Sequence, residues 1–469
     1  MSEQRPYSYE VSAHAEDLVQ RFDGLEPGAE SGERVSVAGR LMLRRVQGKL
    51  AFGTLADQTG RVQLFAPAQS TPEFEAFCSL NLGDWIGVAG EVMTTRRGEL
   101  SVRVDSWELL APTRRSFPDK WHGITDPDIR FRQRYVDLWV TDEARAALRA
   151  RSRIVSLTRR FMEDREYVEV ETPVFHPIPG GALARPFTTH HNALDAQLFL
   201  RIAPELYLKR LVVGGVERVF EIARVFRNEG MSPRHNPEFT MLECYEAYAD
   251  YETHMALTEE LVAHLATELW GTTLLSYQGR ELDLSAPWHR ARLDELTSEA
   301  VGESIGLDTP IERLLELCAT HDVPTRPSYG PGKLLLELYE KLVEHTLWQP
   351  TFVVDYPKEV SPLSRDHRNR PGYTERFEGI VAGRELCNGF SELVDPDEQR
   401  ARFADQVAQR DAGDDEAMAV DEDYLRALDY GLPPTVGLGI GIDRLVMLLT
   451  DSASVRDVIY FPTLRPEAD

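Results

Sequence analysis

The sequence has few cysteines and no long apolar run. Its four cysteines, Cys78, Cys244, Cys318 and Cys387, lie far apart in the 469 residues and form no Cys-x-x-Cys pair. Such spacing favours neither a disulfide framework nor a zinc site. No apolar stretch approaches the ~20 residues that a membrane helix needs, and we see no basic-then-apolar signal segment at the N-terminus. We therefore expect a cytoplasmic protein without a membrane partner.

Positive charge is also scarce. The formal net charge is -25, which ordinarily argues against a nucleic-acid partner. Residues 33–134 differ from the rest, because they contain 15 Lys and Arg against 12 Asp and Glu, a net charge of +3. A chance variation in surface charge would explain this count, but a locally basic module on an acidic protein can also confine RNA to one face.

The chain is long enough for two or three domains. We expect an extension at 1–32, a β-barrel at 33–112, a linker at 113–135, and a larger domain at 136–469 with a mostly helical insertion at about 251–350. Five short alternating runs separated by turn residues, the last being ELSVRVDSWELL, predict the barrel. The pattern is typical of the OB-fold, which binds single-stranded nucleic acid, although a purely structural barrel would share it.

Phe52 and Gln63 are the candidates within the barrel for contact with RNA. Unpaired bases stack on aromatic faces, and a carboxamide reads a base edge with both a donor and an acceptor. The alternative is that Phe52 belongs to the barrel core.

The stretch from Arg218 to Tyr245 predicts a long hairpin around a polar loop, because apolar residues recur in both limbs and the loop holds glycine, asparagine and proline. A passive, half-buried hairpin would not hold many charges, since unpaired buried charge is costly. A polyphosphate site needs a guanidinium with fixed, planar donors, and Arg227 is the candidate. A surface hairpin with ordinary ion pairs is the alternative. The ionisable residues of the stretch include Arg227, Glu229, Arg234, His235, Glu238 and Glu243.

Two segments nearer the C-terminus carry further candidates. Glu378 and Glu385 are seven residues apart and could face one cleft from the two limbs of a hairpin, although unrelated surface glutamates would show the same spacing. Few carboxylates are needed to hold a hard divalent cation that also binds phosphate. GLGIGIDRLVMLL reads as a glycine-rich strand leading into an apolar helix, with Arg444 near the helix start. The acidic stretch at 411–424 predicts a solvated loop.

Together these segments resemble the three motifs of the class II aminoacyl-tRNA synthetases, in the branch for lysine, aspartate and asparagine. FRNEG with RHNPEFTMLE is similar to motif 2, and GLGIGIDRLVMLL to motif 3. The helix expected at about 142–165, with the strand YVEVETPVF, is similar to motif 1. The resemblance implies an α+β fold, in which an OB-fold barrel precedes a catalytic domain built on an antiparallel sheet flanked by helices. It also implies a homodimer through motif 1, although that helix could pack only on its own domain.

The same resemblance implies roles for single residues. Arg227 and Arg444 are the expected catalytic residues, and Glu378 and Glu385 the expected ligands of Mg2+. The expected ATP-binding residues are Arg227, Glu229, Arg234, His235, Phe239 and Arg444; those around the amino acid are Gly181, Glu205, Glu243, Tyr245, Asn388, Phe390 and Glu392; and those around the anticodon of tRNA are Arg45, Phe52 and Gln63.

The expected amino acid is lysine, because an ammonium needs a negative pocket that satisfies three donors. Glu243, Tyr245 and Glu392 offer two carboxylates and a phenol, which resembles the pocket of the lysyl-tRNA synthetases. We expect ATP-dependent activation of L-lysine and its transfer to tRNA(Lys). Cys387 is expected beside this pocket, where it could reshape it. Two alternatives stay open: a relative that attaches lysine or a lysine isomer to a protein or metabolite, and a non-catalytic RNA-binding paralogue.

Overall fold

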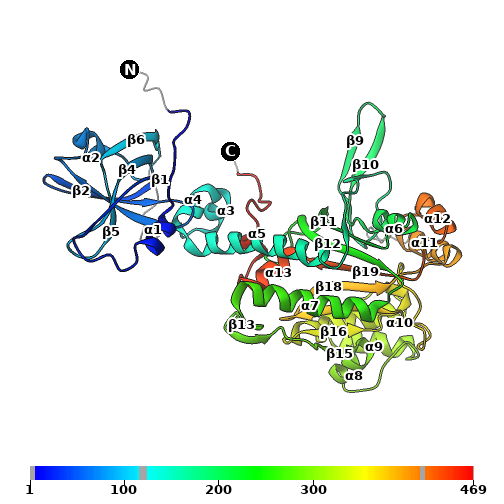
Figure 1. The fold of residues 1–469 in the computed structure, drawn as a ribbon. Helices are drawn as coiled ribbons and strands as arrows, with labels where there is room; N and C mark the ends of the chain where they lie inside the picture. Colours follow the sequence, from blue (N-terminus) through cyan, green and yellow to red (C-terminus); the bar gives the residue numbers. More distant parts are fainter. Residues whose placement is uncertain (1–5, 116–123, 412–417, 468–469) are drawn as a thin grey trace. The chain divides into compact units, whose positions relative to one another are not determined.

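The computed structural model describes residues 6–115, 124–411 and 418–467. The chain forms two compact units, Met1–Arg130 with Tyr135–Thr141 and Phe131–Arg134 with Asp142–Asp469 (Figure 1). The linker expected at 113–135 lies partly outside the described residues, and its described part contains α3 (Pro127–Arg132) and the start of α4 (Arg134–Val140). Within the described ranges, no helix is long and apolar enough to cross a membrane.

The first unit contains the predicted small closed barrel. Its sheet has the order β1-β2-β3-β5-β4-β6, and a further pairing of β1 with β4 closes it. The run expected as the fifth strand is split in two, because the amide of Val104 bonds to β3 and that of Asp105 to β4. The strands are β1 (Glu30–Gln47), β2 (Leu50–Ala56), β3 (Arg61–Pro67), β4 (Trp85–Thr94), β5 (Leu100–Arg103) and β6 (Ser106–Ala111).

The barrel core also takes in the N-terminal segment. Helix α1 (Ala15–Arg21) buries Leu18 in the same cluster as Val37 of β1, and the Ala15 amide donates to Asp57 at 2.7 Å. The described part of the segment expected as a separate extension therefore packs on the barrel, and residues 1–5 lie outside the described residues. A short helix, α2 (Phe74–Ser79), follows β3.

The second unit is built on an eight-stranded sheet of order β15-β16-β17-β18-β19-β12-β11-β7. Its six central strands are antiparallel, whereas the outermost pairs β15–β16 and β11–β7 are parallel. The α+β class is confirmed, with a mixed rather than a purely antiparallel sheet. The strands are β7 (Val168–Glu169), β11 (Arg218–Phe226), β12 (Glu238–Ala247), β15 (His289–Arg292), β16 (Thr351–Val354), β17 (Arg376–Val381), β18 (Arg384–Ser391) and β19 (Thr435–Gly441).

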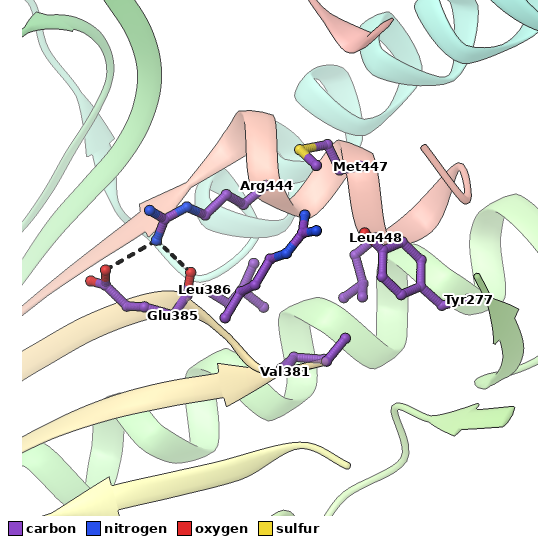
Figure 2. A pocket seen from close by; sticks show the side chains of 9 residues that line it. Tyr277, Val381, Glu385, Leu386, Arg444, Met447 and Leu448 are labelled. Carbon is purple, nitrogen blue, oxygen red and sulfur yellow. Dashed lines mark hydrogen bonds and ion pairs between the residues drawn. The ribbon is translucent and has the colours of Figure 1, made fainter. Parts of the chain in front are cut away.

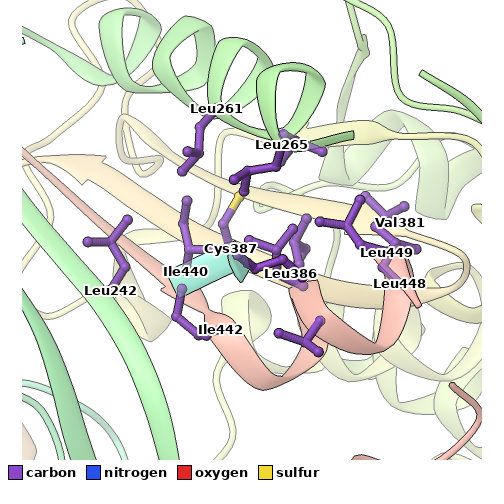
Figure 3. Close-up of a cluster of buried hydrophobic side chains, with 14 of the residues drawn as sticks. Leu242, Leu261, Leu265, Val381, Leu386, Cys387, Ile440, Ile442, Leu448 and Leu449 are labelled. Carbon is purple, nitrogen blue, oxygen red and sulfur yellow. The ribbon is translucent and has the colours of Figure 1, made fainter. Parts of the chain in front are cut away.

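Helices cover one face of this sheet and form its largest core. Phe161 of α5 and Leu261 of α7 pack in one cluster with Cys387 and Ile440 of the sheet. Figure 3 shows α7 lying over these strands, with Leu261 and Leu265 directed at the sheet. Because this face is filled, ligands must approach the opposite one. The helices are α5 (Asp142–Glu163), α7 (Tyr251–Trp270), α13 (Ile442–Leu449) and α14 (Val455–Val458).

The segment 251–350, expected as one helical insertion, differs from that expectation. Helix α7 belongs to the main core, and β15 and β16 are strands of the sheet itself. The helices between β15 and β16 bury a second core that includes Leu317 and Leu338. Helical periodicity is the same in a core helix and in an inserted one, so the sequence could not separate them. The remaining elements are β13 (Leu274–Tyr277), β14 (Arg280–Asp283), α8 (Leu293–Val301), α9 (Ile311–Thr320), α10 (Pro331–Leu342) and two 3-10 turns (Glu344–Thr346 and Lys358–Val360).

A third cluster lies around α6 (Glu205–Val213), α11 (Pro396–Asp411) and α12 (Glu422–Asp429). Part of the acidic stretch expected as a solvated loop is helical here, because Tyr424 and Leu425 of α12 are buried among apolar neighbours; residues 412–417 lie outside the described residues. A small sheet of β8 (Phe175–His176), β9 (Thr188–His191) and β10 (Ala196–Leu200) precedes α6.

Candidate active site

A cavity of about 670 Å³ lies on the face of the large sheet opposite α7. Strands β12, β17, β18 and β19 form its floor, and the loops that follow β11 and precede α6 contribute to its walls. Nearly all residues predicted for this unit line it, namely Gly181, Glu205, Arg227, Glu229, Arg234, His235, Phe239, Glu243, Tyr245, Glu378, Glu385, Asn388, Phe390 and Arg444. The exception is Glu392, which lies behind Gly437.

The predicted hairpin places the middle of this set. Strands β11 and β12 pair from Arg218 and Glu246 to Phe226 and Glu238. Side chains alternate across a strand, so Phe239, Glu243 and Tyr245 face the cavity while Leu242 and Cys244 enter the core. Arg227 follows β11 directly, and its amide donates to the Pro237 carbonyl at 2.8 Å.

The guanidinium groups of Arg227 and Arg234 line the cavity. Neither Arg227 nor Arg234 forms an ion pair with any residue that the structure describes. The Arg227 guanidinium lies 5.2 Å from the centroid of the Phe239 ring. A cation that lies on an aromatic face and has no ion-pair partner is suited to binding an anionic ligand. Stacking of adenine on Phe239 stays a prediction.

Arg444 adds a third guanidinium to the cavity lining, and Figure 2 shows it beside Glu385. Its guanidinium donates to the carbonyl oxygen of Glu385 at 2.6 Å and to the carboxylate at 3.0 Å. His235 lies 3.5 Å away through Nε2. Burial and the charge of Arg444 lower the pKa of His235, so the imidazole is available as a neutral donor or acceptor. Figure 2 also shows Met447 and Leu448 beside Arg444, in a small adjoining pocket.

A β-bulge brings the two predicted metal ligands to one face. Gly379 pairs with Cys387 and Ile380 with Glu385, so Leu386 is an extra residue in β18. A bulge of this kind shifts the alternation of side chains. Glu385 and Asn388 are three apart, yet both line the cavity with Glu378.

The charge around Glu378 and Glu385 fits a divalent cation shared with a ligand. Burial raises the pKa of Glu378 to about 7, and Glu385 adds to this effect, although Arg376 opposes it at 2.7 Å. Burial also raises the pKa of Glu344 to about 7, again with a contribution from Glu385. Among the described residues, no group of three or more His, Cys, Asp and Glu could hold a metal ion. Two hard oxygen donors therefore suit Mg2+ only if phosphate oxygens and water complete its shell.

Another part of the site is acidic, and its carboxyl groups are buried. Glu205, Glu243 and Glu392 are 6%, 5% and 1% exposed. Burial raises the pKa of Glu243 to about 8; Glu205 adds to the shift and Arg227 opposes it. The Tyr245 hydroxyl donates to Glu243 at 3.3 Å. Three buried carboxyl groups here repel one another unless cations are supplied.

One cation is supplied by the chain, and the sequence analysis missed it. Lys209 is fully buried, and its Nζ lies 2.6 Å from Oε1 of Glu205 and in contact with Oε2 of Glu392. Burial alone would lower the pKa of Lys209, but Glu205 and Glu392 more than compensate and raise it. A lysine four residues after Glu205 on a helix was a usable signal, since such residues share a face.

Two glycines shape this acidic end. A Cβ on Gly437 would lie 2.1 Å from Oε1 of Glu392 and 2.6 Å from the Tyr245 ring, so a side chain there would displace one or both groups. Both carboxylate oxygens of Glu392 are buried without a hydrogen bond among the described residues, and only Oε2 lies in ion-pair contact with Nζ of Lys209. Buried polar atoms of this kind are expected where a ligand completes the site. Gly181 has φ +87, and its Cβ would lie 3.0 Å from Cβ of Glu205.

Two further arginines escaped the sequence analysis. Arg376 donates to Oδ1 of Asn388 at 3.0 Å and to Glu378 at 2.7 Å, and so orients both. Arg151 of α5 forms a buried ion pair with Asp443, whose other oxygen accepts from the Thr240 amide at 2.7 Å. This link joins the three segments that resemble motifs 1, 2 and 3.

The expectation that Cys387 lies beside the amino-acid pocket is wrong. Cys387 is 1% exposed and points away from the cavity into the main core under α7, near Leu265 (Figure 3). The bulge is the physical reason, because strict alternation from Glu385 would put Cys387 on the cavity face and Asn388 in the core.

The barrel carries its predicted residues on one outer face. Arg45 pairs with Phe52 across β1 and β2, Phe52 with Phe65, and Thr54 with Gln63. Phe52 is half-buried and outside the core, which is filled by neighbours such as Ala51 and Leu55. The Phe52 and Phe65 rings lie 5.7 Å apart, edge to face. Phe65 was missed, although its spacing from Gln63 indicated a shared face.

Comparison with known proteins agrees with this architecture. Residues 126–465 match the family "tRNA synthetases class II (D, K and N)", and residues 35–110 match an "OB-fold nucleic acid binding domain". The chain therefore belongs to the class II tRNA synthetases of the aspartate, lysine and asparagine branch.

Similar curated proteins are lysine–tRNA ligases. One from Xanthomonas oryzae pv. oryzae (strain MAFF 311018) is 55% identical over 440 residues, which cover 93% of this chain and 87% of the relative. Those of Bordetella bronchiseptica (strain ATCC BAA-588 / NCTC 13252 / RB50) and Prochlorococcus marinus (strain MIT 9303) are 54% and 52% identical, over 98% of this chain and 93% and 94% of theirs.

Proposed function

We propose that this chain is a lysine–tRNA ligase, which activates L-lysine with ATP and transfers it to the 3' end of tRNA(Lys). The observation that carries the proposal is the acidic part of the cavity, where Lys209 contacts Glu205 and Glu392 while the buried Glu243 has no ion pair among the described residues. A substrate with a second ammonium would restore the charge balance, whereas an aspartate side chain would worsen it. No observation favours a ligase for another acceptor or a non-catalytic paralogue.

The reaction needs no nucleophile from the protein. The lysine carboxylate attacks the α-phosphorus of ATP, the bond to the bridging oxygen breaks, and pyrophosphate leaves. A ribose hydroxyl at the end of tRNA then attacks the carbonyl carbon of the mixed anhydride, and AMP leaves. Two anions must approach in the first step, so catalysis consists of positioning and charge neutralisation.

Named residues divide this task. Arg227 holds the α-phosphate, and Arg444 with Arg234 and His235 holds the outer phosphates; the resemblance to motifs 2 and 3 and the place of these donors in the cavity lining support this assignment. Glu229 and Phe239 bind adenine. Mg2+ held by Glu378 and Glu385 supplies further neutralisation of phosphate charge.

The amino acid lies across the acidic end. Glu205 beside Gly181 accepts from the α-amino group, while Glu243, Tyr245 and Glu392 accept from the ε-amino group. Asn388 and Phe390 complete the pocket.

The rest of the chain serves tRNA and assembly. The barrel at 33–112 binds the anticodon through Arg45, Phe52 and Gln63, joined by 113–135 to the catalytic domain at 136–469. A homodimer forms through α5 and β7, an edge strand on which Val168 is 52% exposed; uncovered apolar edges favour association. The activity is cytoplasmic, as for other enzymes of translation.

The test is attachment of labelled lysine to total tRNA with ATP and Mg2+. We expect charging with lysine and none with aspartate or asparagine. Arg227→Ala should abolish lysine-dependent exchange of pyrophosphate into ATP while leaving the protein folded. Arg426→Ala, which removes an exposed arginine of α12, is the matched control. Charging with another amino acid, or full activity of Arg227→Ala, would refute the assignment.

A further inference from the structure

Lys209 lies where a resident ammonium is least expected, inside a pocket proposed to bind ammonium groups. Its side chain has no exposed area and occupies the second turn of α6. Burial of a charge is tolerated only when paired groups surround it. Here Glu205 and Glu392 provide the pairing, and the rings of Phe390 and Tyr424 lie 5.5 Å and 5.8 Å from Nζ.

The two carboxylates that meet at Lys209 come from separate elements. Glu205 begins α6, whereas Glu392 follows the end of β18. Each contacts Nζ through one oxygen, Oε1 of Glu205 and Oε2 of Glu392. A single ammonium therefore fixes the distance between two anions on α6 and after β18, elements that no backbone hydrogen bond joins directly within the described ranges.

Each carboxylate keeps a role toward the cavity. Glu205 lines it directly. Oε1 of Glu392 has no hydrogen-bond partner within the described part of the chain, and it would lie 2.1 Å from a Cβ on Gly437, a residue of the cavity lining. Lys209 thus occupies one oxygen of Glu392 and leaves the other for a ligand.

We propose that Lys209 is a positioning residue that sets the separation between the carboxylates binding the two amino groups of the substrate. The inference rests on the proposed function and deepens it. Lys209 then determines which length of substrate side chain is accepted, because the α-amino group of the substrate must reach Glu205 while its side-chain ammonium reaches Glu392. Ornithine, one methylene shorter than lysine, cannot meet both. A buried lysine that only neutralised charge for folding would have no such effect on length selection.

The experiment compares Lys209→Met with the unsubstituted protein in amino-acid-dependent exchange of pyrophosphate into ATP. The substrates are lysine and ornithine, and KM for ATP is measured in parallel. Lys358→Met is the matched control, since Lys358 also lies between two carboxylates, 3.1 Å from Asp366 and 2.6 Å from Glu398, but outside the cavity.

We expect Lys209→Met to raise KM for lysine roughly tenfold or more, as when a charge-assisted contact is released, and to lower the preference for lysine over ornithine. KM for ATP should stay within about twofold, because the guanidinium end is untouched. An unchanged preference for lysine over ornithine in an active variant would overturn the proposal.

A second background keeps the test decisive if Lys209→Met does not fold. Glu392→Gln removes the charge that Lys209 balances, so Lys209→Met added to Glu392→Gln should fold. We expect this second change to raise KM for lysine further, because Glu205 is released; no further rise would overturn the role. Failure of the unsubstituted protein to use lysine at all would instead refute the proposed function.

Discussion

Replacing Glu243 with glutamine should stabilise the protein while weakening its affinity for lysine. Burial raises the pKa of Glu243 from 4.5 to about 8. Between these values the folded chain keeps a proton that the unfolded chain releases, so folding stability falls as pH rises from 4.5 and levels off above 8. At 1.36 kcal/mol for each pH unit in this window, the penalty is about 3 kcal/mol at pH 7.

Glutamine removes this penalty, because it is never ionised and can still accept from Tyr245. We expect Glu243→Gln to gain about 3 kcal/mol of unfolding free energy at pH 7, little near pH 4.5, and a constant larger amount above pH 8. Urea unfolding at several pH values without lysine measures the gain. At one fixed concentration, lysine should stabilise the unsubstituted protein more than the variant.

The control for this prediction is Glu299→Gln, which alters an exposed glutamate of α8. It should leave both the stability and its pH dependence unchanged. A gain by Glu243→Gln that does not vary with pH would refute the reasoning, because only titration of the buried carboxyl group links stability to pH in this way. A loss of stability would show that the carboxylate is paired in the empty pocket.

Three further outcomes follow from other parts of the structure. Glu378→Gln should raise the Mg2+ concentration needed for half-maximal exchange, and an unchanged requirement would remove Glu378 from the metal site. Arg151→Met should destabilise the catalytic unit by about 3–5 kcal/mol in urea unfolding, since Asp443 is left buried without its cation, and Asp443→Asn added to it should restore part of the loss. Phe52→Ala should weaken tRNA binding by about 1–3 kcal/mol, seen as a raised KM for tRNA in charging. Pyrophosphate exchange by this last variant should be unchanged, and a parallel loss there would point to misfolding.

The sequence predicted those features that depend on local pattern. Alternation along the limbs of the hairpin put Phe239, Glu243 and Tyr245 on one face, and the glycine-rich strand before α13 placed Arg444 at the cavity. The small barrel followed from its short alternating runs.

The remaining features depend on contacts between distant segments. The role of Lys209 depends on its contact with Glu392, which lies 183 positions later in the chain. The role of Arg151 depends in the same way on its ion pair with Asp443. The helical periodicity of the α7 sequence would be the same in a core helix and in an inserted one, so it does not show where the helix packs. Cys387 was misplaced because a bulge is a feature of pairing, which a single strand does not reveal.

Gly437 gives a means of separating the two substrates. A Cβ on Gly437 would lie 2.1 Å from Oε1 of Glu392, the atom that would recognise the ammonium of lysine. A single methyl group, Gly437→Ala, would therefore close the lysine end without altering a charge. Such a protein should bind ATP but not lysine, and binding of ATP measured by calorimetry would then reveal whether the enzyme can take up its nucleotide first.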